Sequence, residues 1–97
     1  MTYVLQHTST LQIYTCMLVN HYQLAYYGVK YWDRLETATE QYPAFLASQA
    51  AIDLENWQVV EMEESRMKLC NVKLKNDPLF HVFFSKSAQI DIKLHES

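Results

Sequence analysis

One helical segment interrupts a chain that is otherwise patterned as strands, and it has the sequence Asp33-Arg-Leu-Glu-Thr-Ala-Thr-Glu-Gln-Tyr-Pro-Ala-Phe-Leu-Ala-Ser-Gln-Ala-Ala-Ile52. Asp33 followed by Glu36 fits a capping box with aspartate at the cap, which predicts a helix start near residue 34. Pro43 disrupts the interior of a regular helix but is favoured as the first residue of a second segment. We therefore expect one bent helix or two short ones over residues 34–54, with a buried face at Phe45, Leu46, Gln49 and Ile52.

Strand patterns flank the helical segment on both sides. Before it, residues 2–6 and 10–19 are predicted to pair across the turn at residues 7–9. After it, we expect strands at residues 57–62, 67–74, 79–84 and 89–95, with a bulge at Asn71 and a turn at residues 76–78.

Residues 22–32 fit two patterns. As a strand they place Tyr22, Leu24, Tyr26, Gly28, Lys30 and Trp32 on one face, and as a helix they extend an apolar stripe into the next segment. The aromatic density favours a strand.

The whole pattern of strands and helix predicts an α+β fold in a single domain of residues 1–97, with a mostly antiparallel sheet covered on one face by the helical part.

Composition narrows the class of protein. A hydrophobic content of 49% and an aromatic content of 13% exclude intrinsic disorder. Gly28 is the only glycine, which excludes glycine-rich phosphate loops and dinucleotide fingerprints. Cys16 and Cys70 show no framework spacing, so we expect reduced thiols. With neither a signal-peptide pattern nor an apolar run of membrane-spanning length, we expect a small, soluble, intracellular domain.

The chain contains cysteine and histidine residues that could serve in catalysis, but their spacing in the sequence matches no catalytic or metal-binding motif. Both cysteines lie in predicted strands, and free cysteine is usually a packing residue rather than a nucleophile. The four histidines lack the paired spacing of zinc ligands. The sequence therefore predicts no enzyme, no cofactor and no metal site.

Charge is sorted along the chain. Residues 33–64 carry eight acids and one base, a net −7, whereas residues 1–32 carry no acid and one base. Residues 65–97 carry six bases and three acids, a net +3. A concentrated acidic middle is an argument about partners, and it indicates a basic one.

The acids fall into groups on the predicted elements. Asp33, Glu36 and Glu40 form one stripe along the predicted helix, in which like charges at i,i+4 are unfavourable. Glu61 and Glu63 share one face of the next strand, and Glu64 follows them. Such a row of carboxylates resembles the charge spacing of a nucleic-acid strand. The alternative is a solvated face, because surface acids are common in soluble domains.

Five aromatic residues fall between residues 22 and 32. Aromatic platforms for single-stranded nucleic acid need a basic groove, and only Lys30 lies in this stretch. We therefore expect core packing for most of these rings. Tyr31 and Trp32, which abut Asp33, are the best candidates for anchors of a protein interface.

Three acidic runs also carry a resemblance: Asp33 to Glu40, Asp53-Leu-Glu55 and Glu61-Met-Glu-Glu64. On these the chain resembles the small phage-encoded anti-CRISPR proteins, and more narrowly a DNA-mimicking inhibitor of the type I-F surveillance complex. The resemblance implies a non-enzymatic protein of the bacterial host cytoplasm. It would occupy the basic DNA-binding groove of the complex near the site that reads the protospacer-adjacent motif, without binding nucleic acid or membrane itself. Because these inhibitors share no motif, the partner-binding residues are assigned by charge and position as Tyr31, Trp32, Asp33, Glu36, Glu40, Asp53, Glu55, Glu61, Glu63 and Glu64.

A second hypothesis stays open. The chain is then a small homodimeric structural or regulatory α+β module, whose acidic face meets its own basic C-terminal third. Displacement of a bound partner by DNA would favour the inhibitor, and self-association without such a partner would favour the module.

Overall fold

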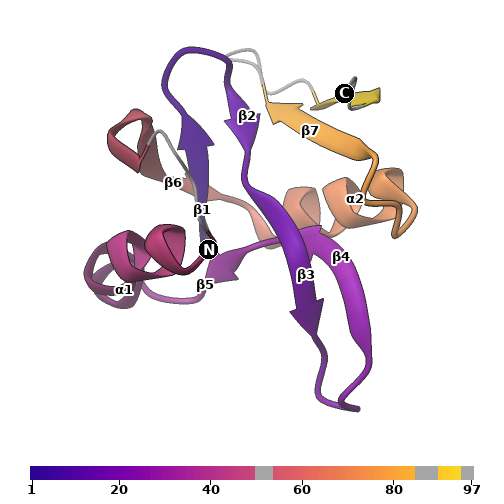
Figure 1. Cartoon of the computed structure of the whole chain (residues 1–97), viewed down its shortest axis with the longest axis horizontal. Coiled ribbons are helices and arrows are strands. Elements are labelled where there is room, and N and C mark those ends of the chain that lie inside the picture. Colours follow the sequence, from indigo (N-terminus) through magenta and orange to yellow (C-terminus); the bar gives the residue numbers. More distant parts are fainter. Residues whose placement is uncertain (50–53, 85–89, 95–97) are drawn as a thin grey trace.

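The structure is a computed structural model that describes residues 1–49, 54–84 and 90–94 (Figure 1). In chain order its elements are β1 (Thr2–His7), β2 (Gln12–Ile13), β3 (Thr15–Val19), β4 (Ala25–Val29), β5 (Tyr31–Trp32), α1 (Leu35–Ser48), the 3-10 turn η1 (Leu54–Asn56), β6 (Trp57–Met62), α2 (Glu64–Leu74), β7 (Phe80–Phe84) and β8 (Ile90–Leu94).

The main sheet is built around β1. One edge of β1 pairs along its whole length with β6, from Thr2 opposite Met62 to His7 opposite Trp57. The other edge is shared, because β5 pairs with the first half of β1 and β2 with the second half. From β2 the sheet continues through β7 to β8. All of these pairings are antiparallel, as the sequence predicts.

A hairpin of β3 and β4 forms a second, two-stranded sheet. Its strands continue from β2 and into β5, so its base is held in the main sheet: the amide of Tyr14 donates to the carbonyl of Leu5, and the amide of Lys30 donates to the carbonyl of Tyr14. The side chain of Asn20 organises the turn by accepting hydrogen bonds from the amides of Tyr22 and Leu24. Figure 1 shows this hairpin projecting from the body of the molecule.

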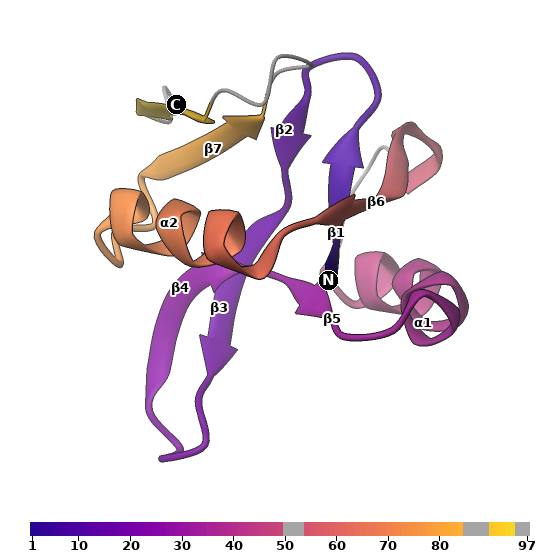
Figure 2. The same cartoon turned by 180° about the vertical axis from the view of Figure 1, so that it is seen from behind.

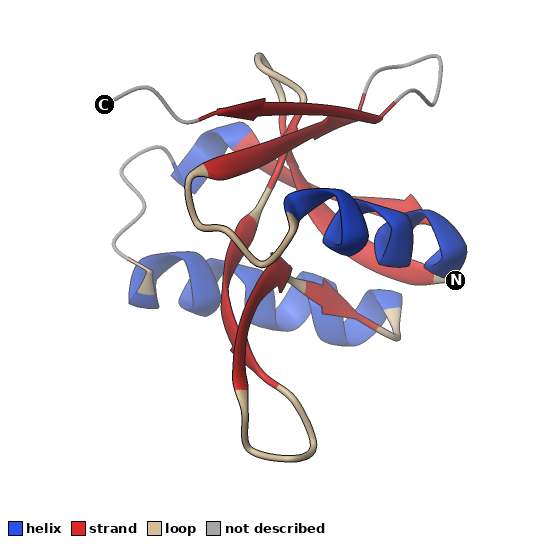
Figure 3. Ribbon diagram, turned by 90° about the vertical axis from the view of Figure 1, so that its right-hand side faces the viewer, coloured by secondary structure: helices blue, strands red, loops and turns tan. Residues whose placement is uncertain are grey.

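Each face of β1 packs against a different helix. Val4 packs with Met67 and Cys70 of α2, whereas Leu5 packs with Ala38 and Leu46 of α1. Because neighbouring residues of a strand point to opposite faces, α1 and α2 lie on opposite sides of β1. Figures 2 and 3 show the same arrangement, with α2 in front in both views and α1 farther back in Figure 3. Neither helix has the length and apolar character needed to cross a membrane, within the part of the chain that is described.

The α+β class and most strands are confirmed. β6 has the predicted bounds, and β1, β7 and β8 agree with prediction to within a residue. The ambiguous stretch at residues 22–32 contains two strands, β4 and β5. The predicted strand over residues 10–19 is divided into β2 and β3, because Tyr14 lies where the chain leaves the main sheet for the hairpin.

The strand predicted over residues 67–74 is wrong, because these residues belong to the helix α2. Met67, Cys70 and Leu74 are the buried residues of α2, and their spacing of three and four is that of one helix face. The slip of apolar phase around Asn71 is therefore the helical period and not a bulge. This second helix covers the face of β1 that α1 leaves open.

The details of the first helix also differ from prediction. Arg34 is the N-cap of α1 and makes no side-chain capping bond, so Asp33 and Glu36 do not form a capping box. Pro43 lies inside a single helix that ends at Ser48. Leu46 is buried as predicted and Phe45 is half-buried, whereas Gln49 is exposed. Ile52 lies outside the described residues.

Candidate functional site

Both helices begin at the same end of the sheet. β5 and β6 are antiparallel to β1 and flank it, with Tyr3 of β1 opposite Trp32 on one side and Glu61 on the other. The last residues of β5 and β6 therefore both lie at the start of β1. The helix α1 follows β5 after two residues, and α2 follows β6 after one. The first turns of both helices are thus brought to this end, as the view from behind shows (Figure 2).

This end of the molecule collects five of the predicted acidic residues, which we call the acidic end: Asp33, Glu36, Glu61, Glu63 and Glu64. Asp33 lies between β5 and α1, and Glu36 lies in the first turn of α1. Glu61 lies near the end of β6, Glu63 is the N-cap of α2, and Glu64 opens its first turn. All five side chains are exposed.

Local bases offset this charge only in part. Arg34 Nε lies 3.6 Å from Glu36 Oε2, and Lys68 Nζ lies 3.4 Å from Glu64 Oε1, with all four side chains more than 60% exposed. Such surface pairs stabilise a fold by at most about 1 kcal/mol and exchange readily with other partners. Within the described residues, the other three carboxylates of the acidic end form no ion pair.

Two of the predicted acids lie elsewhere. Glu40 is exposed on α1, one turn beyond Glu36. Glu55 lies in the turn η1 before β6, so about 14 Å of strand, from Trp57 to Glu61 at ~3.4 Å per residue, lies between it and Glu61. Asp53 lies outside the described residues. The acidic middle of the sequence is therefore divided in space.

The two predicted aromatic anchors have different environments. Tyr31 is 37% exposed, but Trp32 is only 6% exposed. The indole of Trp32 donates to Gln41 Oε1 at 3.2 Å and meets the ring of Phe45 edge to face, with centroids 5.8 Å apart. The prediction of an interface role for Trp32 is corrected accordingly: it is a core residue, and Tyr31 is the one available to a partner.

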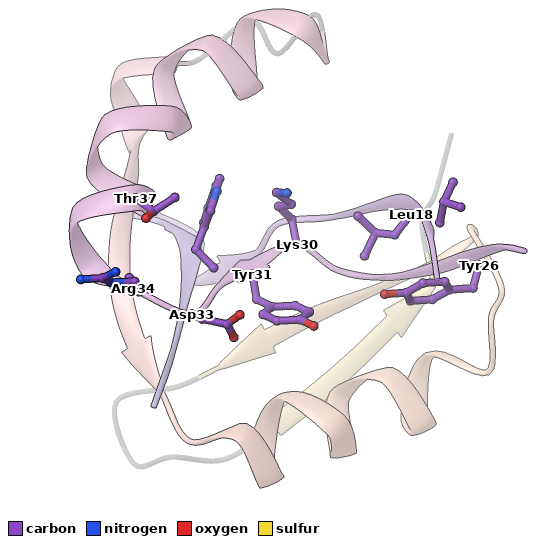
Figure 4. A pocket seen from close by; sticks show the side chains of 9 residues that line it. Leu18, Tyr26, Lys30, Tyr31, Asp33, Arg34 and Thr37 are labelled. Atoms are coloured by element: carbon purple, nitrogen blue, oxygen red, sulfur yellow. The ribbon is translucent and has the colours of Figure 1, made fainter. Parts of the chain in front are cut away.

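A cleft of about 560 Å³ lies between the hairpin and the start of α1, beside the acidic end (Figure 4). Its lining residues come from three segments and are Leu18, Val19, Tyr26, Lys30, Tyr31, Trp32, Asp33, Arg34 and Thr37. In Figure 4 the hydroxyls of Tyr26 and Tyr31 point toward each other, while Lys30 extends the opposite way. The Lys30 ammonium lies 4.9 Å from the ring centroid of Trp32 and 5.1 Å from that of Phe45, a cation–π arrangement.

Leu18 and Tyr26 were not among the predicted site residues. Tyr26 shares a predicted strand face with Lys30 and Trp32, and this shared face was the one local pattern in the sequence that could have indicated its place in the cleft. Leu18 comes from the preceding strand, opposite Tyr26 in the hairpin register, so only the pairing of β3 with β4 brings it to the cleft.

Neither cysteine has the environment of a nucleophile. Burial raises the pKa of the Cys70 thiol to about 11, against an ordinary 9.0. Burial also raises the pKa of Cys16, and the nearby charge of Lys30 opposes that rise. Both thiols are therefore protonated at neutral pH, whereas the thiolate is the reactive form. Among the described side chains, no three His, Cys, Asp or Glu residues gather as metal ligands would.

No protein-family model, no curated protein and no solved structure matches this chain.

Proposed function

We propose that this protein is a non-enzymatic inhibitor that presents its acidic end, as a mimic of DNA, to a basic nucleic-acid-binding surface. The observation that carries the proposal is the joint pairing of β5 and β6 with β1, which collects five exposed carboxylates at the place where two helices start. Following the resemblance noted above, the partner is the DNA-binding groove of a CRISPR surveillance complex of type I-F, in the cytoplasm of a bacterial host.

The spacing within the acidic end supports a collective effect. Neighbouring strands lie about 4.8 Å apart, so the ends of β5 and β6 on either side of β1 are about 10 Å apart. This is about one Debye length at 0.1 M salt, so their charges are only partly screened from one another. A basic partner therefore meets one negative field, and such fields accelerate association and select the partner.

Helix stability accounts for only some of these acids. Glu36, Glu63 and Glu64 lie at helix N-termini, where the helix dipole favours negative charge by about 0.3 to 1 kcal/mol each. Glu61 lies in a strand, and no described base is paired with it. Its position beside the helix starts supports the proposal, because neither a helix dipole nor a described ion pair accounts for it.

The test is competition for DNA. Purified type I-F surveillance complex is mixed with its target duplex and with increasing amounts of the protein, and bound DNA is followed by mobility shift. We expect stoichiometric loss of DNA binding by the wild-type protein. Glu61→Lys with Glu63→Lys should weaken the inhibition at least tenfold, because reversal sets like charges against a basic groove.

The matched control is Glu55→Lys, which reverses an exposed glutamate at the other end of β6. It should inhibit within about twofold of the wild type. Unchanged DNA binding at a tenfold excess of wild-type protein would overturn the proposed partner. Equal loss in the Glu55 variant would show that total charge matters and that the acidic end has no special role.

A further inference from the structure

The free edge of the hairpin exposes backbone hydrogen-bonding groups. The amides of Tyr27 and Val29 in β4 donate to Asn76 Oδ1 and Asn71 Oδ1, so they point away from β3. In the hairpin register Met17 is opposite Tyr27, and Val19 is two residues further along β3. Because antiparallel pairs alternate, the N–H and C=O groups of Met17 and Val19 point outward from the other edge of β3.

No described residue protects this edge of β3. Within the described residues, no hydrogen bond reaches the outward groups of Met17 or Val19, and the register of β3 with β4 contains no bulge. Neither strand contains a proline or a charged residue, which are the usual devices against edge pairing. The side chains of Met17 and Val19 are 56% and 63% exposed. Figure 1 shows the hairpin projecting from the body, and Val19 near the end of β3 also lines the cleft beside the start of α1.

We propose that β3 pairs antiparallel with β3 of a second copy of this chain, about a twofold axis at Leu18. In this register Met17 lies opposite the partner's Val19, and each of these residues donates and accepts one backbone hydrogen bond. A symmetric contact requires a surface that complements itself, and this strand places apolar residues opposite apolar residues. The contact joins two marginal two-stranded sheets into one of four strands.

The charge distribution permits a second copy to approach this edge. Residues 1–32 contain no acid and one base, Lys30, so two hairpins approach without like charges opposite each other. The acidic end, in contrast, repels its own copy. Self-association uses the backbone edge of β3, whereas the partner contact proposed above uses carboxylates, and the two surfaces adjoin at the cleft that Leu18, Val19 and Asp33 line.

Contacts at the base of the hairpin restrict the part of β3 with which a second copy can pair. The hydroxyl of Tyr27 donates to the carbonyl of Phe80 at 2.8 Å and lies 2.6 Å from Thr15 Oγ1. The start of β7 is therefore close to Thr15. Pairing centred on Leu18 uses the outer part of β3 and leaves this contact in place.

The first test is the oligomeric state. Sedimentation velocity over a concentration series should show the wild-type mass rising to twice the monomer mass. Met17→Lys with Val19→Lys should remain monomeric throughout, with an unchanged circular dichroism spectrum. The control Val72→Lys replaces a residue of α2 that is 71% exposed and should behave as wild type. A monomeric wild type at every concentration, or a dimer that only Val72→Lys dissociates, would overturn the proposal.

The second test traps the register. In a Cys16→Ser background, Leu18→Cys places two thiols across the twofold axis at a pair without direct hydrogen bonds, where Cα atoms lie about 4.5 Å apart. That distance permits a disulfide. Mild oxidation should give a covalent dimer, whereas Thr39→Cys, at an exposed position of α1, should give none. Equal cross-linking of both variants would contradict the β3 contact.

Discussion

The Oδ1 atom of Asn71 accepts a hydrogen bond from the backbone amide of Val29 at 2.8 Å. Two residues earlier in β4, the amide of Tyr27 donates to Asn76 Oδ1 at 2.6 Å. α2 and the turn after it therefore close the edge of β4 with side-chain amides, where another strand would ordinarily pair. Gly28 lies between these two contacts, and a Cβ atom there would be 2.8 Å from Asn71 Oδ1. The only glycine of the chain thus permits the close approach of α2.

Replacing Gly28 with alanine should destabilise the fold by about 1 to 2 kcal/mol. Overpacking costs about 1 to 3 kcal/mol, and the stiffer unfolded chain offsets less than about 1 kcal/mol of it. Urea unfolding monitored by circular dichroism measures the difference. An alanine variant as stable as the wild type would mean that Asn71 moves aside without loss.

Asn71→Ala should cost about 1 to 3 kcal/mol, because the buried amide of Val29 loses its acceptor. The double variant with Gly28→Ala should lose less than the sum of the two single variants by about 1 kcal/mol, since the added methyl then meets no amide. Strict additivity in this cycle would refute the proposed contact between the two positions.

Glycine substitutions at two neighbouring residues after α2 distinguish the effect of backbone strain on stability from that of a hydrogen bond. Lys75 and Asn76 both have a φ of 55°, in the left-handed region that favours glycine. Lys75→Gly should stabilise the fold by about 0.5 to 1 kcal/mol, as expected for glycine at a helix C-terminus. Asn76→Gly should destabilise it by about 1 kcal/mol or more, because the amide of Tyr27 loses its acceptor. A gain in both variants would show that the Asn76 contact adds little.

Pro43 lies inside α1 on an exposed position and donates no backbone hydrogen bond. Pro43→Ala should therefore raise the free energy of unfolding by up to about 3 kcal/mol. Thermal unfolding gives the change, with Ala44→Ser as a control for substitution at an exposed position nearby. A lower melting temperature would indicate that the packing of Phe45 and Leu46 depends on Pro43.

The buried thiol predicts the response to alkaline pH. The pKa of Cys70 is raised by burial to about 11, so above pH 9.0 the unfolded chain releases this proton while the folded chain retains it. The folded state then binds more protons, and its stability falls as pH rises from about 9 toward 11. Urea unfolding at pH 8 and pH 10 should show a smaller loss in Cys70→Ala than in wild type. An equal loss would assign the alkaline response to other groups, such as Tyr26 and Tyr27, whose pKa values burial also raises.

Local patterns in the sequence were enough for most of the sheet. Alternation over residues 57–62 predicted β6 with its observed bounds, and Asn76-Asp77-Pro78 predicted the turn before β7. The same reasoning failed for α2, where Met67, Cys70 and Leu74 are buried among residues that also show partial alternation. A short apolar pattern fits both periods, and burial against Val4 and Val82 selects the helix.

The sequence by itself determined that the chain forms an α+β domain with an acidic middle. The positions of the acids are read directly from the sequence, and short-range periodicity depends only on residues close together in the chain. Only the tertiary structure decided which acids lie together. Trp32 and Glu61 lie opposite Tyr3 on its two sides. Trp32 is 29 residues (32 − 3) and Glu61 is 58 residues (61 − 3) from Tyr3 along the chain. Long-range strand pairing is selected by burial of both faces of β1, and no local pattern contains that information. The same pairing buries Trp32 and leaves Tyr31 exposed.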